Sequence, residues 1–271
     1  MTRHAASPWP LLALLSVSVL INYLDRSNLG AAAPLLAREM NLPDSRLGLL
    51  LSAFFWTYAS CQVLAGWLVD RFRVVYVYAA GFLLWSLATG AIGLAQGFGT
   101  LLVLRLALGA GESVAFPAYS KILVHAFGEN QRGMANSIID ACTKIGPAAG
   151  LYFAAWMMSE TGWRSFFLVT GFGALAWLPF WLRYAPARLG SAGKEAENPA
   201  DAGPGWRELL SSRTVWATFI GLFCHNYNWY LLLTWLPTIL VRERKFTLLG
   251  MGAWNASLLA ITGIFTSSST L

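Results

Sequence analysis

Four charged side chains lie inside segments of the sequence that are otherwise apolar. Asp25 and Arg26 interrupt one of these segments, and Arg105 and Glu112 interrupt another. A charged residue at the centre of a lipid bilayer costs about 2.5 to 3.5 kcal/mol on insertion scales, so such residues pair with one another or face a water-filled cavity. Carboxylates there can bind protons, and guanidinium groups can hold anions through two parallel hydrogen bonds. We therefore predict proton and anion chemistry at these four positions.

Helical spacing brings these residues toward one another. Glu112 follows Arg105 by seven positions, so the two side chains project from the same face of a helix. With a rise of about 1.5 Å per residue, Asp25 and Arg105 lie at about the same depth, and Glu112 lies about 10 Å further along, near the midplane. Burial there disfavours the charged form of a carboxyl group, so we expect Glu112 to bind a proton. The alternative is that the four charges only neutralise one another between helices.

The composition indicates that the elements carrying these residues lie in lipid. Of the 271 residues, 56% are hydrophobic and only 12% are charged, whereas about a quarter of the residues of an average soluble domain are charged. The net charge of +6 comes without a basic stripe or a stacking platform, so we exclude nucleic acid as a partner. The three cysteines lie in apolar segments, too far apart for a metal site or a disulfide framework. We predict an all-α membrane protein with no cofactor and no metal.

About 20 apolar residues are needed for a helix to cross the hydrocarbon of a bilayer. On that basis we expect eight spanning helices, near residues 9–31, 47–69, 74–96, 99–124, 134–158, 163–183, 214–240 and 248–271. The joint after the sixth is long and contains proline, glycine and charges of both signs. We therefore divide the chain into a six-helix bundle (1–183), a cytoplasmic linker (184–213) and the incomplete start of a second bundle (214–271).

The distribution of basic residues predicts the orientation of the chain. More Lys and Arg residues fall in the joints on the side of the N-terminus than in those on the opposite side. The positive-inside rule then places the N-terminus in the cytoplasm, in a multi-pass protein of the inner or plasma membrane. The eighth apolar segment runs to Leu271. We expect a truncated or frameshifted product, with about four further helices encoded downstream.

The end of the second expected span carries a known motif. The run Gly66-Trp67-Leu68-Val69-Asp70-Arg71 resembles the G-x-L-x-D-R signature of the major facilitator superfamily. The resemblance implies two six-helix halves, built of inverted three-helix repeats, that expose a central site to each side of the membrane in turn. We expect Gly66 to permit close helix contact, and Asp70 and Arg71 to gate the cytoplasmic side, with Asp70 paired to a helix end or an arginine. Arg73 and Val74 replace the later glycine and second basic residue of the motif.

A narrower resemblance rests on four segments. They are Asn22-Tyr23-Leu24-Asp25-Arg26, Arg105 with Glu112, Lys144-Ile145-Gly146-Pro147, and Thr234-Trp235-Leu236-Pro237-Thr238. Together these segments resemble the anion:cation symporter family. The resemblance implies symport of protons with sugar acids such as galactonate or glucarate, or with other organic anions.

The same resemblance implies roles for individual residues. Asp25 and Glu112 would carry the protons. Arg105 would anchor the anion, with Arg26 as a second cation of the substrate site. Tyr23 and Tyr58 would line the cavity as hydrogen-bonding groups.

Two further polar clusters lie in the fifth and seventh expected spans. Asp140 and Lys144 are four residues apart, so we expect them to form an ion pair on one helix. The run from His225 to Tyr230 is polar where a simple anchor helix would be apolar. There we expect Tyr227 and Asn228 to hydrogen-bond a hydroxylated substrate.

Three alternatives to an anion symporter remain. A drug or cation/proton antiporter is disfavoured because two arginines face only two acids, and protonation of one acid leaves a positive site. A membrane-embedded enzyme would need a nucleophile, metal or cofactor motif, which the sequence does not contain. A non-transporting remnant would lack part of the cavity wall. The partners we expect are a small organic anion, a proton and the lipid bilayer.

Overall fold

The computed structural model describes residues 7–190 and 206–268, and the regular secondary structure in these ranges is helical, with no strand. Apart from η2, a single π-helical turn, the elements are α-helices. They are α1 (Trp9–Glu39), α2 (Asp44–Arg71), α3 (Val74–Ile92), α4 (Phe98–Glu112), α5 (Ala115–Ala126), α6 (Glu129–Ala174), α7 (Trp177–Leu189), α8 (Trp206–Ser211), α9 (Arg213–Tyr230), η2 (Leu231–Trp235), α10 (Leu236–Arg242) and α11 (Leu248–Ser268).

Two of the expected spans are joined within α6. Its backbone bends at Gly162, where φ is +82°, a conformation that glycine adopts without the steric strain of a Cβ atom. The part before Gly162 is the expected fifth span, and the part after it continues into α7 as the expected sixth. Similarly, α4 and α5 together form the expected fourth span.

Four helical stretches of the described residues are long and apolar enough to cross a membrane, namely 44–71, 74–92, 98–126 and 129–189. The expected first, seventh and eighth spans are not among these stretches. In α1 we attribute this to the polar run from Asn22 to Asn28 in the middle of the helix. That run lies inside the protein, so it needs no contact with lipid.

Half of the expected linker, residues 184–213, lies outside the described residues. α7 continues to Leu189, and α8 begins at Trp206. Parts of the expected linker on either side of residues 191–205 are therefore helical; the structure does not describe residues 191–205.

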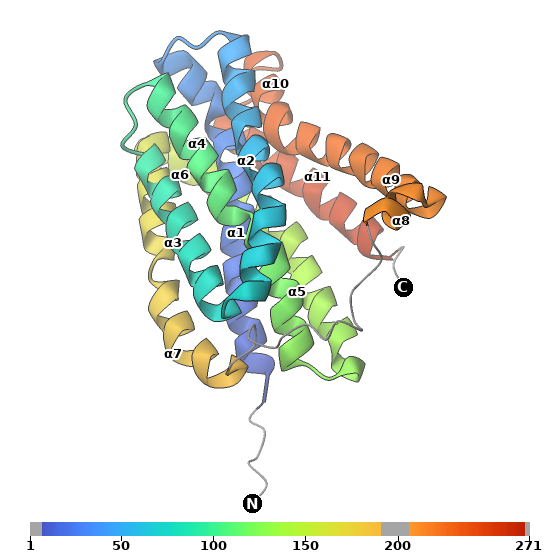
Figure 1. Ribbon diagram of the computed structural model, residues 1–271. Coiled ribbons are helices and arrows are strands. Elements are labelled where there is room, and N and C mark those ends of the chain that lie inside the picture. The colour runs from blue at the N-terminus through green and yellow to red at the C-terminus, as the bar shows by residue number, and fades with distance from the viewer. Residues whose placement is uncertain (1–6, 191–205, 269–271) are drawn as a thin grey trace, which may run out of the picture.

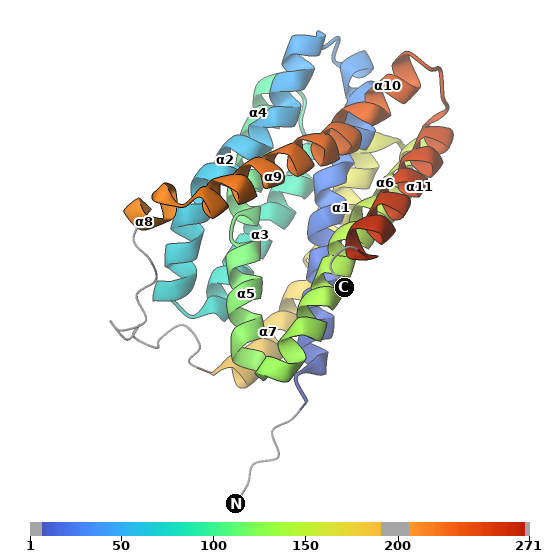
Figure 2. The same cartoon turned by 90° about the vertical axis from the view of Figure 1, so that its right-hand side faces the viewer.

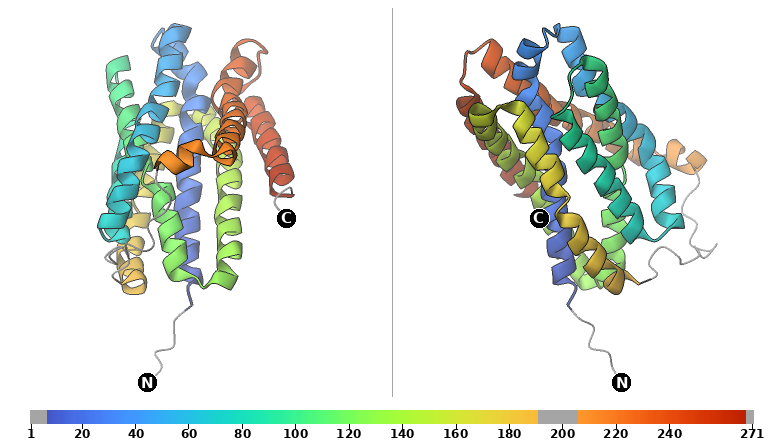
Figure 3. Two further views of the ribbon diagram at one scale, coloured as in Figure 1. Left: turned by 45° about the vertical axis from the view of Figure 1, so that its right-hand side comes forward. Right: turned by 90° about the vertical axis from the view of Figure 1, so that its left-hand side faces the viewer.

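The helix α1 runs through the bundle formed by α1 to α7 (Figure 1). It packs along α6, while α3 packs against both α4 and α6, and α2 packs against α4. The helices α8 and α9 lean away from the bundle in Figure 1 and cross in front of α2 in the view of Figure 2, whereas α10 contacts α1 and α11 lies along α6 (Figure 3). The later helices thus approach the middle of α1 from one side of the bundle.

A cluster of aromatic side chains packs α1, α3, α5 and α7 against one another. Tyr78 of α3 packs edge-on against Trp177 and Trp181, with ring centroids 5.8 and 5.2 Å apart. Its buried hydroxyl group contacts Ser18 Oγ of α1 at 2.7 Å and Tyr119 Oη of α5 at 3.0 Å. Buried aromatic residues contribute large apolar areas, and a satisfied hydroxyl group avoids the cost of an unpaired polar atom. This cluster therefore holds α1 in a fixed rotation about its own axis.

The opposite end of α1 is held by a polar contact with α6. The Glu39 carboxylate accepts hydrogen bonds from Trp163 Nε1 at 2.6 Å and from Arg164 Nη2 at 2.9 Å. These two bonds hold the pKa of Glu39 below its usual range. They anchor the end of α1 beside the bend at Gly162.

Candidate functional site

The polar run of α1 is buried at the centre of the bundle. Asn22, Asp25 and Arg26 expose only 0%, 2% and 5% of their surfaces. Spacings of three and four residues place these side chains on one helical face. The rotation of α1 fixed by the aromatic cluster turns that face toward the other helices.

An ion pair joins α1 to α4 at this level. Arg26 Nε donates to Glu112 Oε2 at 2.8 Å, and the two side chains are 3% and 0% exposed. Separating such charges in a dry interior leaves an uncompensated charge, so the pair is strongly held while both partners are ionised. Protonation of Glu112 would remove the charge that Arg26 faces.

Close helix packing brings Glu112 to Arg26. At Gly109 of α4, an added Cβ atom would lie 2.2 Å from the backbone oxygen of Phe54 in α2. Thr57 of α2 also donates to the backbone oxygen of Leu106 at 2.7 Å. Only glycine fits so close an approach of two backbones, and Glu112 follows Gly109 by three residues.

Aromatic rings surround the Arg26 guanidinium group. Its Cζ atom lies 4.7 Å from the ring centroid of Tyr23, 4.5 Å from that of Tyr58, 5.7 Å from that of Phe54 and 5.9 Å from that of Phe116. The negative faces of such rings attract a cation, most strongly where water is excluded. The structure therefore brings together Arg26, Glu112, Tyr23 and Tyr58, which the sequence also grouped.

Tyr230 completes this group from the later helices. Arg26 Nη1 donates to Tyr230 Oη at 3.3 Å. Tyr230 is the last residue of α9 and precedes the π-helical turn η2. Pro237 has no N–H group to bond the carbonyl four residues earlier, which explains why the α-helix is interrupted here. Tyr230 was not among the site residues predicted from the sequence. Pro237 was the one sequence feature that could have indicated a local change of helical register beside it.

Asp25 and Arg105 are the other two buried charges, and no ion pair within 4.0 Å joins them in the described residues. The Asp25 Oδ1 atom accepts from Asn28 Nδ2 at 3.1 Å. The Arg105 guanidinium lies 5.1 Å from the Phe54 ring and interacts electrostatically with both Asp25 and Glu112. Asp25 Oδ2, Arg26 Nη2, Arg105 Nε and Glu112 Oε1 have no hydrogen-bond partner among the described residues. The four charges thus retain capacity for an additional proton or anion.

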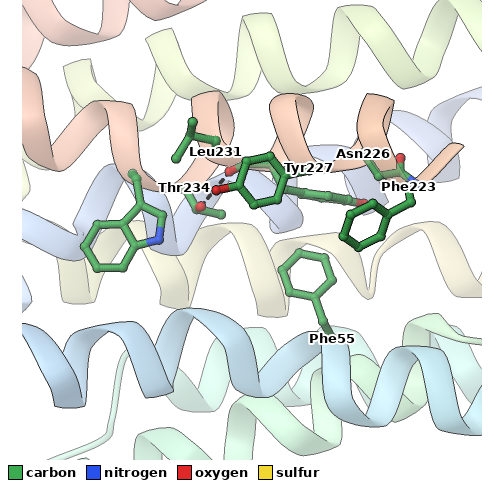
Figure 4. Close-up of a pocket in the computed structure, with 8 residues that line it drawn as sticks. Phe55, Phe223, Asn226, Tyr227, Leu231 and Thr234 are labelled. Atoms are coloured by element: carbon green, nitrogen blue, oxygen red, sulfur yellow. Dashed lines mark hydrogen bonds between the residues drawn. The ribbon is translucent and has the colours of Figure 1, made fainter. Parts of the chain in front are cut away.

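Two cavities border this group. One, of about 340 Å³, lies between Phe55 of α2 and the face of α9 and η2 that carries Tyr227 and Tyr230 (Figure 4). The other, of about 390 Å³, is lined by Tyr23 of α1 and by parts of α5, α6 and α9. Arg105 and Glu112 line neither cavity. Tyr230 lines the first cavity and Tyr23 lines the second, and both tyrosines contact Arg26.

The two other predicted substrate residues lie apart from the buried charges. Tyr227 lines the first cavity, but its side chain is 64% exposed. Asn228 is exposed on α9 and lines neither cavity. The exposure of Tyr227 and of Asn228 follows from the lean of α9 away from the bundle.

The arrangement of helices and buried charges has a counterpart in a known family. Residues 15–270 match the family model of the Major Facilitator Superfamily. The chain belongs to this superfamily. Its fold is therefore that of an all-α membrane protein of the major facilitator type.

Individual members of the superfamily are similar over most of the chain. A probable sulfoacetate transporter of Cupriavidus necator is 32% identical over 269 residues, which cover 94% of this chain and 61% of that protein. A probable galactarate/D-glucarate transporter of Escherichia coli is 30% identical over 291 residues, which cover 96% of this chain and 64% of that protein. The chain thus spans about three fifths of the length of these relatives. Both are transporters, as the sequence predicted in excluding an enzyme.

A solved structure supports the same fold. It is that of a bacterial homologue of the human lysosomal transporter Spinster, in an inward-facing and unoccupied conformation. The TM-score is 0.83 at 20% sequence identity, and the match covers 97% of this chain and 61% of the other.

The superfamily motif at the end of α2 differs from our expectation in two ways. A Cβ atom at Gly66 would meet no atom within 4 Å, so the predicted close helix contact at this glycine is wrong in this conformation. Asp70 pairs with Lys121 of α5 at 3.0 Å rather than with an arginine, and Lys121 Nζ also donates to the backbone oxygen of Val69 at 3.1 Å. Arg71 is exposed. The motif thus connects the end of α2 to α5 through Lys121, which lies in the expected fourth span.

The predicted ion pair between Asp140 and Lys144 is also wrong. No contact within 4.0 Å joins their charged groups in the described part of this superfamily member. Instead, Lys144 Nζ lies 5.1 Å from the ring centroid of Trp229 on α9. The side chain turns toward a neighbouring helix because an aromatic face is available there.

Proposed function

We propose that this chain carries the proton and anion site of a secondary active transporter. The transporter would move small organic anions, such as sugar acids, together with protons by alternating access. The observation that carries this proposal is the buried ion pair between Arg26 and Glu112, in which Arg26 contacts Tyr23 and Tyr230 of two cavity walls.

The geometry suggests how proton and anion become coupled. While Glu112 is ionised, its carboxylate occupies one donor of Arg26. A proton on Glu112 leaves Arg26 charged without a counter-ion, which is unfavourable in a dry site. An anionic group entering beside Tyr23 or Tyr230 restores the balance and can use the fork of guanidinium donors. Proton and anion then strengthen each other's binding by the same factor, and this linkage favours symport.

Asp25 and Arg105 take a supporting part in the proposal. Arg105 interacts with both carboxylates, so it limits the charge that develops when one of them binds or releases a proton. Asp25 is the second acid able to carry a proton. The substrate binds Arg26 rather than Arg105 in this proposal, because Arg26 contacts Tyr23 and Tyr230 of the cavity walls.

The relatives support an anionic substrate. One is described as a probable sulfoacetate transporter and the other as a probable galactarate/D-glucarate transporter. All three named compounds are small organic anions. We extend that substrate class to this chain, and we place it in the inner or plasma membrane with its N-terminus in the cytoplasm, as the basic joints indicate.

Calorimetry in two buffers tests the linkage directly. D-glucarate is titrated into the purified chain in lipid nanodiscs, in buffers of equal pH that differ in ionisation enthalpy. The proposal expects the observed heat to depend on the buffer, because the protein takes up protons as the anion binds. Binding with no net proton uptake at any pH between acid and alkaline conditions would contradict the coupling.

Uptake into vesicles tests the transport step. Proteoliposomes are given an inward proton gradient and radiolabelled D-glucarate. The expected result is accumulation that a protonophore abolishes. Uptake no greater than that of protein-free vesicles would contradict transport by this chain, and proton-driven exit of an organic cation would favour the antiporter.

A further inference from the structure

Lys144 faces the second cavity without an acidic partner. This cavity of about 390 Å³ is also lined by Tyr23, Asp140, His225 and Asn226. Lys144 has no ion pair within 4.0 Å among the described residues. An ammonium group in a half-enclosed polar cavity with no carboxylate in contact is a binding point for an anion.

The neighbours of Lys144 keep its charge available. Asp140 precedes it by one helical turn and is exposed; its Oδ1 atom is 3.5 Å from Thr143 Oγ1. Trp229 lies under the ammonium group, and the His225 ring is stacked on Trp229 with centroids 6.5 Å apart. The aromatic face orients the cation without neutralising it.

Tyr23 separates this cation from Arg26. The Tyr23 ring lies 4.7 Å from the Arg26 guanidinium and also lines the cavity of Lys144. At Gly146, two residues after Lys144, an added Cβ atom would lie 2.8 Å from Tyr23 Cβ. This contact holds α6 against α1 beside Tyr23. Two cations therefore border the same tyrosine, one buried and ion-paired, the other facing the cavity.

We propose that Lys144 binds a second anionic group of the substrate, so that the site selects dianions over monoanions. The inference rests on the proposed function, in which Arg26 binds the first anionic group. In this proposal, one anionic group of the substrate binds Arg26 beside Tyr23, and the other binds Lys144 in the cavity that Tyr23 also lines. A monoanion of the same length leaves Lys144 unused.

A matched pair of ligands tests this selectivity. D-glucarate carries a carboxylate at each end, whereas D-gluconate has the same carbon chain with one carboxylate. Affinities are measured by calorimetry for the wild-type chain, Lys144→Gln, Lys144→Arg and the control Arg213→Gln, which removes an exposed charge at the start of α9. We expect the wild type to prefer D-glucarate by about tenfold or more, as for a hydrogen bond to a charged group. Lys144→Gln should abolish the preference while D-gluconate binding stays unchanged, and Lys144→Arg and the control should keep it.

A spectroscopic readout locates the second anionic group. In protein labelled with fluorotryptophan, the Trp229 resonance is assigned by its loss in Trp229→Phe. D-glucarate should shift this resonance, and D-gluconate should shift it much less.

Each outcome separates this inference from the proposed function. Equal binding of both anions, unaffected by Lys144→Gln, would overturn the role of Lys144 and leave the proposed function standing. Absence of binding of either anion to the wild type would overturn both. A loss of D-gluconate binding in Lys144→Gln would show that the lysine supports the cavity as a whole, and it would also overturn the selectivity.

Discussion

At the scale of single residues, the two arginines of the bundle differ in their surroundings. Arg26 has one donor on Glu112, one on Tyr230 and aromatic rings on its faces, and those contacts extend to both cavities. Arg105 lies behind Phe54 and meets the carboxylates only electrostatically. The resemblance of the sequence to a transporter family implied that Arg105 anchors the anion. Of these two arginines, Arg26 is the one in contact with Tyr23 and Tyr230, which line the two cavities; we therefore propose Arg26 as the anchor.

Replacing Arg26 by lysine tests that assignment. Lysine keeps the charge but lacks the planar fork, so Arg26→Lys should weaken D-glucarate binding by about 1.5 to 3 kcal/mol, the contribution of one charge-assisted hydrogen bond. Arg105→Lys should have a smaller effect, and the exposed Arg213→Lys should have none. Affinities from calorimetry decide the matter, and a larger loss in Arg105→Lys than in Arg26→Lys would return the anchor to Arg105.

The proton-binding role of Glu112 gives a second prediction. Glutamine imitates the protonated carboxyl group, so Glu112→Gln should bind D-glucarate with an affinity that no longer falls as the pH rises. In vesicles it should exchange substrate but fail to accumulate it with a proton gradient. We would measure affinity across the pH range and uptake with and without the gradient. A variant that keeps the pH dependence of the wild type would assign the coupled proton to another group, with Asp25 as the next candidate.

At the scale of helices, glycines set the separations that the site requires. The contacts at Gly109 with α2 and at Gly146 with α1 position Glu112 and Lys144 respectively. At Gly171 of α6 an added Cβ atom would lie 2.0 Å from the backbone nitrogen of Gly90 in α3. These positions are spread over the bundle, so the relative placement of several helices depends on the absence of a single methyl group at each.

A pair of alanine substitutions tests the packing role of Gly109. Gly109→Ala should destabilise the protein by about 1 to 3 kcal/mol, because the methyl group must push α4 away from the backbone of α2. Gly66→Ala is the matched control, since it adds the same methyl group to a helix where no atom lies within 4 Å. Thermal denaturation of the purified variants in nanodiscs provides the comparison. Equal melting temperatures would show that α4 and α2 adjust freely at Gly109.

At the scale of the whole molecule, the early and late helices meet at one end and separate at the other. Arg242 of α10 donates to Asp44 at the start of α2, and an added Cβ atom at Gly30 would lie 2.5 Å from the backbone oxygen of Leu233. At the N-terminal end of α9, α8 projects away from the bundle (Figure 1). We call the end of the described helices that carries Asp44 and Arg242 the closed end.

Charge reversal at Asp44 tests whether the ion pair between Asp44 and Arg242 keeps the early and late helices together at the closed end. An exposed pair contributes only about 0 to 1 kcal/mol, so neutralisation would change little, whereas Asp44→Arg adds repulsion with Arg242. With spin labels at Ser45 and Glu243, pulsed EPR should show a longer and broader distance distribution in Asp44→Arg. The double variant Asp44→Arg, Arg242→Asp should restore the original distribution, and Glu129→Arg at the opposite end should leave it unchanged. An unaltered distribution in Asp44→Arg would assign closure to the backbone contact at Gly30 alone.

The sequence by itself determined the membrane class, the helical fold and the identity of the buried charges. The physical reason is that hydrocarbon admits only helices with satisfied backbones and makes an unpaired charge costly, so composition and spacing carry the information. Asp25, Arg26, Arg105 and Glu112 were found in this way without any knowledge of their partners. Tyr23 and Tyr58 were reached through the resemblance of four segments of the chain to a transporter family.

The tertiary structure alone decided which of these groups are paired. The pairing of Arg26 with Glu112, the contact of Arg26 with Tyr230 and the turn of Lys144 toward Trp229 each join residues on different helices. Spacing along one helix wrongly predicted a pair between Asp140 and Lys144, because it contains no information on what the neighbouring helix offers. The rotation, separation and lean of the helices depend on contacts such as that of Gly109 with Phe54, and on the π-helical turn before Pro237. Such contacts belong to pairs of packed helices rather than to any one segment of the sequence.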